Sequence, residues 1–244
     1  MMRRLFFFML LVCVAGVGCA RREAPQAQGI DTVTVVSLLD DFKKGAYEGR
    51  IYYAELMQHG RFGIGTVDGL DGEMMILNGR VYRFDVAGKA SVLDPTNTTP
   101  SATVTFFEPD TKFDVGELSD DVFRKTMDWK RPPGVGLVAF RITGLFDVVK
   151  TRSVPRQSQP YRPLSAVATN TVESEWRDTA GTMIGFYFPD ALKDVNWPGY
   201  HLHFIDKERE RGGHVLSFKL RQGRIDMDPC SALYVMMATN AVAK

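Results

Sequence analysis

Three of the four histidines in the 244-residue chain lie within fourteen residues, at positions 201, 203 and 214. His201 and His203 are two residues apart in an apolar run, so in a β-strand both imidazoles point to one face. The charged residues 206–211 predict the turn of a hairpin, and Gly212-Gly213 would begin a second strand that carries His214 back beside the first pair. Three imidazole nitrogens would then converge on one point.

Such a triad is a typical ligand set for a metal ion. Neutral imidazole suits Zn²⁺ and also Fe, Mn or Ni. Three protein ligands leave a coordination position open, as in catalytic rather than structural sites. A single His-x-His motif is weak evidence, because a lone histidine on a sheet is more often a surface residue or a hydrogen-bonded core residue. Three histidines at hairpin spacing favour the metal site.

The remainder of the chain predicts a mainly β protein with a few short helices, of the α+β class. Short β-branched and aromatic runs alternate with Gly and Pro turns, and Asn78-Gly79 between two apolar runs is the strongest hairpin signal. A helix is expected over residues 119–129, ended by the Pro-Pro-Gly that follows Arg131. Beyond it we expect strands at residues 137–142, 144–152, 181–188, 201–205, 215–220 and 224–227.

The first residues of the chain have the pattern of an export signal. Arg3 and Arg4 precede an apolar run that is too short for a membrane helix and ends in small residues. We therefore expect a signal over residues 1–19 and a tether over residues 20–31, with the protein exported to the periplasm or cell envelope. Cys19 is a candidate for the acylated cysteine of a lipoprotein; simple cleavage nearby and an uncleaved anchor are the alternatives.

The charge of the mature chain excludes one class of function. Removing Arg3 and Arg4 with the signal leaves 28 basic and 29 acidic side chains, a net charge of −1. There is no overall basic excess to recruit a polyanionic partner, either nucleic acid or an anionic membrane surface. Cys230 would remain without a cysteine partner, so no intrachain disulfide is expected. A chain of this length can bury a sufficient core without one.

Five blocks of the sequence resemble, in order and spacing, the bacterial α-acetolactate decarboxylases. The blocks are Gly65-Thr66-Val67-Asp68-Gly69-Leu70-Asp71-Gly72-Glu73, Lys150-Thr151-Arg152-Ser153-Val154-Pro155, Gly181-Thr182-Met183-Ile184-Gly185-Phe186-Tyr187, Pro198-Gly199-Tyr200-His201-Leu202-His203-Phe204-Ile205 and Gly212-Gly213-His214-Val215-Leu216. The resemblance covers about residues 33–230, nearly the whole mature chain. It is far more specific than the histidine motif alone.

The resemblance implies a reaction, a cofactor and a site. The reaction is the conversion of 2-acetolactate to acetoin and CO₂. The cofactor is Zn²⁺, held by the three histidines, with Glu73 and Arg152 beside it as catalytic residues and with Thr66 and Arg152 contacting the substrate. The resemblance also implies a homodimer and two β-sheet subdomains, which we expect at residues 32–133 and 134–244. We expect a mixed sheet and an antiparallel, barrel-like sheet, the second carrying the metal site.

The chain departs from the family in one respect. The family often contributes a further glutamate from a longer C-terminal tail, whereas no carboxylate side chain follows Asp228 in this sequence. If that glutamate handles a proton, another group or a water molecule must replace it here.

Two other functions remain open at this point. A cupin-type metal oxygenase or isomerase is partly matched by the histidine triad together with Glu208, but Val195 and Val215 stand where that motif requires glycines. An exported module that binds a metal or a small acid without turnover is the other alternative. It would not need an arginine and a glutamate beside an open three-histidine site.

Overall fold

The computed structural model describes residues 31–131, 134 and 136–237 of the chain. The predicted export signal, Cys19 and all of the tether except Asp31 therefore lie outside the described residues. Within the described ranges, no helix has both the length and the apolar composition needed to cross a membrane.

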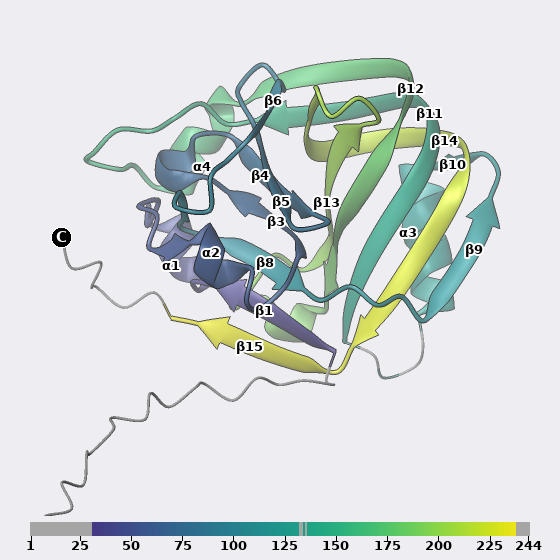
Figure 1. Ribbon diagram of the computed structural model, residues 1–244, viewed down its shortest axis with the longest axis horizontal. Coiled ribbons are helices and arrows are strands. Elements are labelled where there is room, and N and C mark those ends of the chain that lie inside the picture. Colours follow the sequence, from purple (N-terminus) through teal and green to yellow (C-terminus); the bar gives the residue numbers. More distant parts are fainter. Residues whose placement is uncertain (1–30, 132–133, 135, 238–244) are drawn as a thin grey trace, which may run out of the picture.

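The fold is mainly β, as predicted, and contains two large sheets (Figure 1). The first has seven strands and is mixed: β1 and β15 are parallel, and every other pair of neighbouring strands in this sheet is antiparallel. In spatial order its strands are β15 (Ala232–Met236), β1 (Thr32–Val36), β8 (Ala102–Thr105), β3 (Phe62–Thr66), β4 (Glu73–Leu77), β5 (Arg80–Phe84) and β6 (Ala90–Val92).

The second sheet is antiparallel and closes on itself. Its strands are β10 (Leu118–Ser119), β14 (Gly212–Cys230), β11 (Leu137–Ser153), β12 (Val172–Phe188) and β13 (Gly199–Asp206), with β9 (Thr111–Val115) paired to β14. Because β13 also pairs with β14, the strands β14, β11, β12 and β13 form a small barrel. Figure 1 shows β11, β12 and β14 as long strands that curve along one side of the molecule.

Short elements complete the fold. A two-stranded ribbon joins β2 (Ile51–Tyr52) to β7 (Thr98–Thr99). The helices are α1 (Leu39–Lys43), α2 (Tyr53–Leu56), α3 (Asp120–Lys130) and α4 (Leu164–Val167), with single 3₁₀ turns η1 (Asp68–Leu70), η2 (Ala168–Asn170) and η3 (Asp190–Leu192). The predicted helix after residue 119 is thus confirmed as α3, and Ser119 caps it by accepting from the Val122 N–H.

Two apolar cores explain how β13 is held. Leu202 and Phe204 point into the barrel, where Phe123 of α3 also packs. Ile205 points the other way, into the core between the barrel and the seven-stranded sheet, where it meets Phe84. This alternation follows from the two-residue period of a strand, and it directs every second residue of β13 toward the seam between the sheets.

Each sheet contains strands from both halves of the chain. The segments β9 and β10 precede residue 134 but pair with β14, and β15 near the end of the chain pairs with β1. The division into subdomains at residues 133 and 134 stays a prediction.

The strand breaks predicted near residues 143 and 221–223 are wrong, because β11 and β14 each run through them as one strand. Gly144 and Gly223 lie opposite each other in this pair. A Cβ at Gly144 would stand 2.3 Å from the carbonyl oxygen of Gln222, so glycine permits a close backbone approach here. Directly after Gly144, the pairing register between β11 and β14 shifts between Leu145 and Phe146. These glycines therefore mark a bend and a close contact, which sequence alone did not distinguish from a strand end.

Gly185 on β12 gives a direct test of this packing. A Cβ at Gly185 would lie 1.9 Å from the His201 carbonyl oxygen, and backbone cannot yield as a flexible side chain can. We expect Gly185→Ala to lower the free energy of unfolding by about 2 kcal/mol or more, as for other overpacked sites. Gly116→Ala is the control, because a Cβ there meets no atom within 4 Å. Urea denaturation measures both; equal midpoints for the two variants would contradict the close approach.

Candidate metal centre and active site

The structure brings the three predicted ligands together at the edge where the barrel closes. His203 on β13 stands opposite His214 on β14. One ring nitrogen from each of His201, His203 and His214 lies within 4.8 Å of the others. The ring centroids are separated by 4.8 Å for His201 and His214, 5.1 Å for His201 and His203, and 5.4 Å for His203 and His214. The convergence predicted from the hairpin spacing is confirmed.

His203 has the surroundings of a metal ligand. Its side chain is fully buried, and Nδ1 lies 2.9 Å from the backbone carbonyl oxygen of Met74 on β4. A carbonyl oxygen can only accept, so Nδ1 carries the hydrogen and Nε2 keeps its lone pair. Nε2 is buried and has no hydrogen-bond partner among the described residues. A buried, unpartnered acceptor held by a hydrogen bond on the other ring nitrogen fits a metal site.

The electrostatics of the triad keep all three rings neutral. Burial, which disfavours the charged imidazolium, lowers the pKa of His201 to about 4 and those of His203 and His214 well below the ordinary value. The positive charge of Arg152 contributes in the same direction. Neutral imidazole is the form that binds a metal ion, so these residues fit such a ligand near pH 7.

The hairpin that presents the triad depends on Asp206 and on two glycines. The buried Asp206 carboxylate accepts hydrogen bonds from the N–H groups of Glu210 and Arg211, which closes the predicted turn. A Cβ at Gly212 would lie 2.1 Å from the Phe204 carbonyl oxygen, and Gly213 has a φ of +150° that favours glycine. Larger residues would therefore separate β14 from β13.

Glu73 reaches the triad from the other sheet. It is the first residue of β4, and its Oε2 lies 3.5 Å from Nε2 of His203. Gly72 before it has a φ of +90°, and a Cβ there would stand 2.1 Å from the Phe84 carbonyl oxygen, so glycine is needed at this turn. Burial raises the pKa of Glu73 to about 7, while Arg152 opposes that shift. Glu73 is thus a buried carboxyl that can hold a proton near neutral pH.

Arg152 completes the cluster. It lies on β11 opposite His214, and its charge affects the pKa values of Glu73 and of the histidine triad. Its Nε is buried and has no hydrogen-bond partner among the described residues. A guanidinium with a buried unpaired donor is suited to bind an anionic oxygen of a ligand. Arg152, Glu73 and the triad therefore form one electrostatically coupled cluster, and their roles in catalysis stay predictions.

Thr66 lies behind this site. It is buried, stands opposite Glu73 in the β3–β4 pair, and donates from Oγ1 to the Gly72 carbonyl oxygen at 2.7 Å. This bond holds the turn that delivers Glu73. The predicted contact between Thr66 and a substrate stays a prediction.

Sequence reasoning missed Met74. Its backbone carbonyl orients His203, and no side-chain pattern records a backbone acceptor on a strand 129 residues away. Glu208, which would serve a cupin-type site, lies in the exposed turn between β13 and β14.

Comparisons with known proteins agree with this geometry. Residues 33–242 match the family described as alpha-acetolactate decarboxylase. An alpha-acetolactate decarboxylase of Methylococcus capsulatus is 40% identical over 204 residues, which cover 80% of this chain and 75% of that protein. One from Klebsiella aerogenes is 36% identical over 189 residues, covering 77% and 72%.

Solved structures give the same result for the fold. The crystal structure of alpha-acetolactate decarboxylase from Bacillus subtilis strain 168 superposes with a TM-score of 0.83 and 30% sequence identity, covering 86% of this chain and 90% of that one. The five sequence blocks and the fold thus lead to one conclusion. The chain belongs to the α-acetolactate decarboxylase family and is a lyase.

Proposed function

We propose that the chain converts 2-acetolactate to acetoin and CO₂, with Zn²⁺ held by His201, His203 and His214 as its cofactor. Family membership supports the decarboxylation of acetolactate. The observation that carries the metal assignment is the buried Nε2 of His203, which has no hydrogen-bond partner among the described residues and faces two further neutral imidazoles. Three imidazoles are a donor set that suits catalytic Zn²⁺.

The chemistry requires a positive charge and a proton donor. In 2-acetolactate a keto group neighbours the carbon that bears both the hydroxyl and the carboxylate. When the bond to the carboxylate breaks, its electron pair moves toward the keto oxygen and gives an enediolate, and CO₂ leaves. One proton is then added to the same carbon, which yields acetoin. The rate rises only if the site stabilises charge as it develops on the oxygen.

A bound Zn²⁺ would supply a Lewis acid that polarises the oxygen atoms of the substrate. Burial keeps the three rings neutral, the form that binds a metal ion, and a metal ion would replace the 3.0 Å hydrogen bond between His201 Nε2 and His214 Nδ1. The hydrogen bond from His203 to Met74 fixes which ring nitrogen is free.

Arg152 would hold the anionic part of the substrate. The negative charge of the carboxylate disappears as CO₂ forms, so binding the carboxylate alone would not accelerate the reaction. The guanidinium contributes to the rate if it also faces the oxygen that becomes negative. Its buried, unpaired Nε gives it a donor for that oxygen.

Glu73 would deliver the proton. In the metal-free site burial raises the pKa of Glu73 to about 7, so this side chain can carry a proton near neutral pH, and a general acid works best when its pKa is close to the operating pH. Among the described residues, Glu73 is the carboxylate whose oxygen comes within 4.0 Å of a ring nitrogen of the triad. We therefore assign to Glu73, acting directly or through a water molecule, the step that the family's tail glutamate would otherwise share.

One assay separates this proposal from the alternatives. Purified protein is incubated with racemic 2-acetolactate without O₂, acetoin and CO₂ are measured, and bound metal is determined on the same sample. Acetoin formation with stoichiometric zinc supports the proposal. A requirement for O₂ with bound iron supports a cupin-type enzyme, and ligand binding without acetoin supports a binding module.

Location and assembly complete the proposal. From the signal pattern and the family resemblance we propose that the chain is exported, with lipid on Cys19, and acts as a homodimer. Mass spectrometry of the mature N-terminus tests the lipid, because a first residue other than Cys19 excludes it. Sedimentation of the mature protein tests the dimer.

The metal ligands can be tested by replacing His203. We expect His203→Ala to bind zinc at least about tenfold more weakly, since loss even of a residue that orients a ligand costs that much, and to lose acetoin formation. Metal content after dialysis measures the first effect. His59→Ala is the matched control, because His59 stacks on Tyr234 and takes no part in the triad. Full zinc content in His203→Ala would contradict the assignment.

Replacing Glu73 should lower turnover without the loss of zinc that is expected for His203→Ala. Glu73→Gln keeps the shape of the side chain but cannot donate a carboxyl proton, so we expect unchanged zinc content and a kcat lower by about 10²–10⁴-fold. The exposed Glu55, changed to Gln, is the control and should leave kcat unaltered. A zinc-loaded Glu73→Gln enzyme with full turnover would refute the assignment.

A further inference from the structure

A strongly cationic hollow of about 490 Å³ lies at the edge of the seam between the two sheets. Four cationic side chains and one carboxylate line it. The cations are Lys112, Arg141, Arg209 and Arg224, and the carboxylate is Asp226. None of them belongs to the metal centre. The cations come from β9, β11, β14 and the turn between β13 and β14, so that chain segments far apart in the sequence place like charges together.

Asp226 arranges two of these cations rather than neutralising the hollow. It is buried, and its Oδ2 accepts from Nε and Nη2 of Arg141 at 2.9 and 2.6 Å. Its Oδ1 accepts from Nε of Arg224 at 2.9 Å. In the β9–β14 pair Asp114 stands opposite Arg224 and Lys112 stands opposite Asp226, but Arg224 forms its ion pair with Asp226. One carboxylate thus positions two guanidinium groups, and its single negative charge leaves the lining of the hollow with excess positive charge.

Arg209 and Lys112 carry the remaining charge. Arg209 has a φ of +65°, an uncommon conformation for a residue other than glycine, and it lies in the turn that joins the strands of the metal ligands. Its Nη1 is buried without a hydrogen-bond partner among the described residues. Among the described residues, no carboxylate lies within 4.0 Å of the Lys112 ammonium group. The Arg209 guanidinium lies over the Tyr82 ring, 5.9 Å from its centroid. In the described part of the chain neither Arg209 nor Lys112 has a carboxylate within 4.0 Å, so both can bind an oxyanion.

Neutral donors complete the lining. Thr143 and Thr182 stand opposite each other on β11 and β12, and Asn78 reaches the hollow from the β4–β5 turn. Hydroxyl and amide groups beside guanidinium groups are the usual donors around a phosphate or carboxylate oxygen. The lining therefore offers several donors of differing geometry to one oxyanion.

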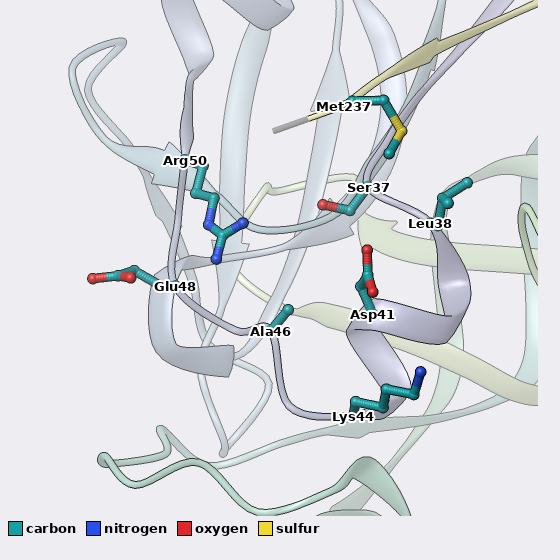
Figure 2. Close-up of a pocket in the computed structure, with 8 residues that line it drawn as sticks. All are labelled: Ser37, Leu38, Asp41, Lys44, Ala46, Glu48, Arg50 and Met237. Atoms are coloured by element: carbon teal, nitrogen blue, oxygen red, sulfur yellow. The ribbon is translucent and has the colours of Figure 1, made fainter. Parts of the chain in front are cut away.

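A second hollow in the protein has balanced charge and differs in this from the cationic hollow. It has a volume of about 400 Å³ and lies beside α1 and the end of β15 (Figure 2). Its charged residues are Asp41, Glu48, Lys44 and Arg50, two of each sign, and Lys44 also binds Asp40. Equal charge gives that hollow no preference for an anion.

We propose that the cationic hollow is a binding site for a phosphate-class oxyanion. Such an ion would accept from Arg209, Lys112 and the guanidiniums that Asp226 orients. It would also bridge Asn78 of the seven-stranded sheet to the residues of the barrel. The ion could be free in solution or be the headgroup of an anionic lipid, since both present the same oxygens.

The site is tested on the purified metal-containing protein by calorimetric titration with inorganic pyrophosphate at constant ionic strength. We expect saturable binding that Arg209→Gln weakens at least about fivefold, as for loss of a charge-assisted hydrogen bond. Lys112→Gln should weaken it in the same direction and serves if Arg209→Gln fails to fold. The control is Lys193→Gln, because Lys193 is exposed and does not line the hollow.

The source of the oxyanion is distinguished by vesicle sedimentation. Binding to vesicles that contain phosphatidylglycerol but not to phosphatidylcholine alone, lost in Arg209→Gln, identifies a lipid headgroup. Pyrophosphate binding without vesicle binding identifies a free ion, and both outcomes support the site. The proposal is overturned if neither pyrophosphate nor the anionic vesicles bind, or if the variants and the control bind alike. It is also overturned if Arg152→Gln abolishes binding while Arg209→Gln does not, which would place the ion at the metal centre.

Discussion

The hydrogen bond from His203 Nδ1 to the Met74 carbonyl is the contact on which the site depends. It joins the barrel to the seven-stranded sheet at the point where Glu73 begins β4. It also sets the tautomer of His203, which leaves Nε2 free inside the protein. Without this bond the sheets could still pack through their shared apolar core, but the ring could turn and the triad would lose its fixed geometry.

Burial has two effects here that cannot be separated. The apolar seam holds β13 against β4, and the same exclusion of water lowers the pKa values of the histidines and raises that of Glu73. Neutral imidazoles and a protonated carboxyl are the forms that the proposed reaction needs. Arg152 limits the shift of Glu73, because its positive charge favours the carboxylate. The packing of the two sheets therefore sets the chemistry as well as the position of these groups.

Local features could be predicted from the sequence, and contacts between distant strands could not. The histidine hairpin and the Asn78-Gly79 turn follow from spacing over a few residues, and both are confirmed. Glu73 and Arg152 would pass for ordinary surface residues without the family resemblance, since nothing local shows that they meet. The cationic hollow was hidden because a balanced total charge says nothing about where charges gather. The strand breaks predicted near residues 143 and 221–223 are wrong because glycine occurs both at strand ends and where two backbones approach closely.

The central claim is that the hairpin triad holds a metal ion for the decarboxylation of acetolactate. X-ray absorption at the zinc edge on active, purified protein tests it most directly. We predict three imidazole nitrogens at about 2.0–2.1 Å, with one or more oxygen ligands from solvent or substrate. In His203→Ala the imidazole count should fall. An active enzyme that contains no metal, or one whose metal is surrounded by oxygen or sulfur ligands alone, would contradict the account.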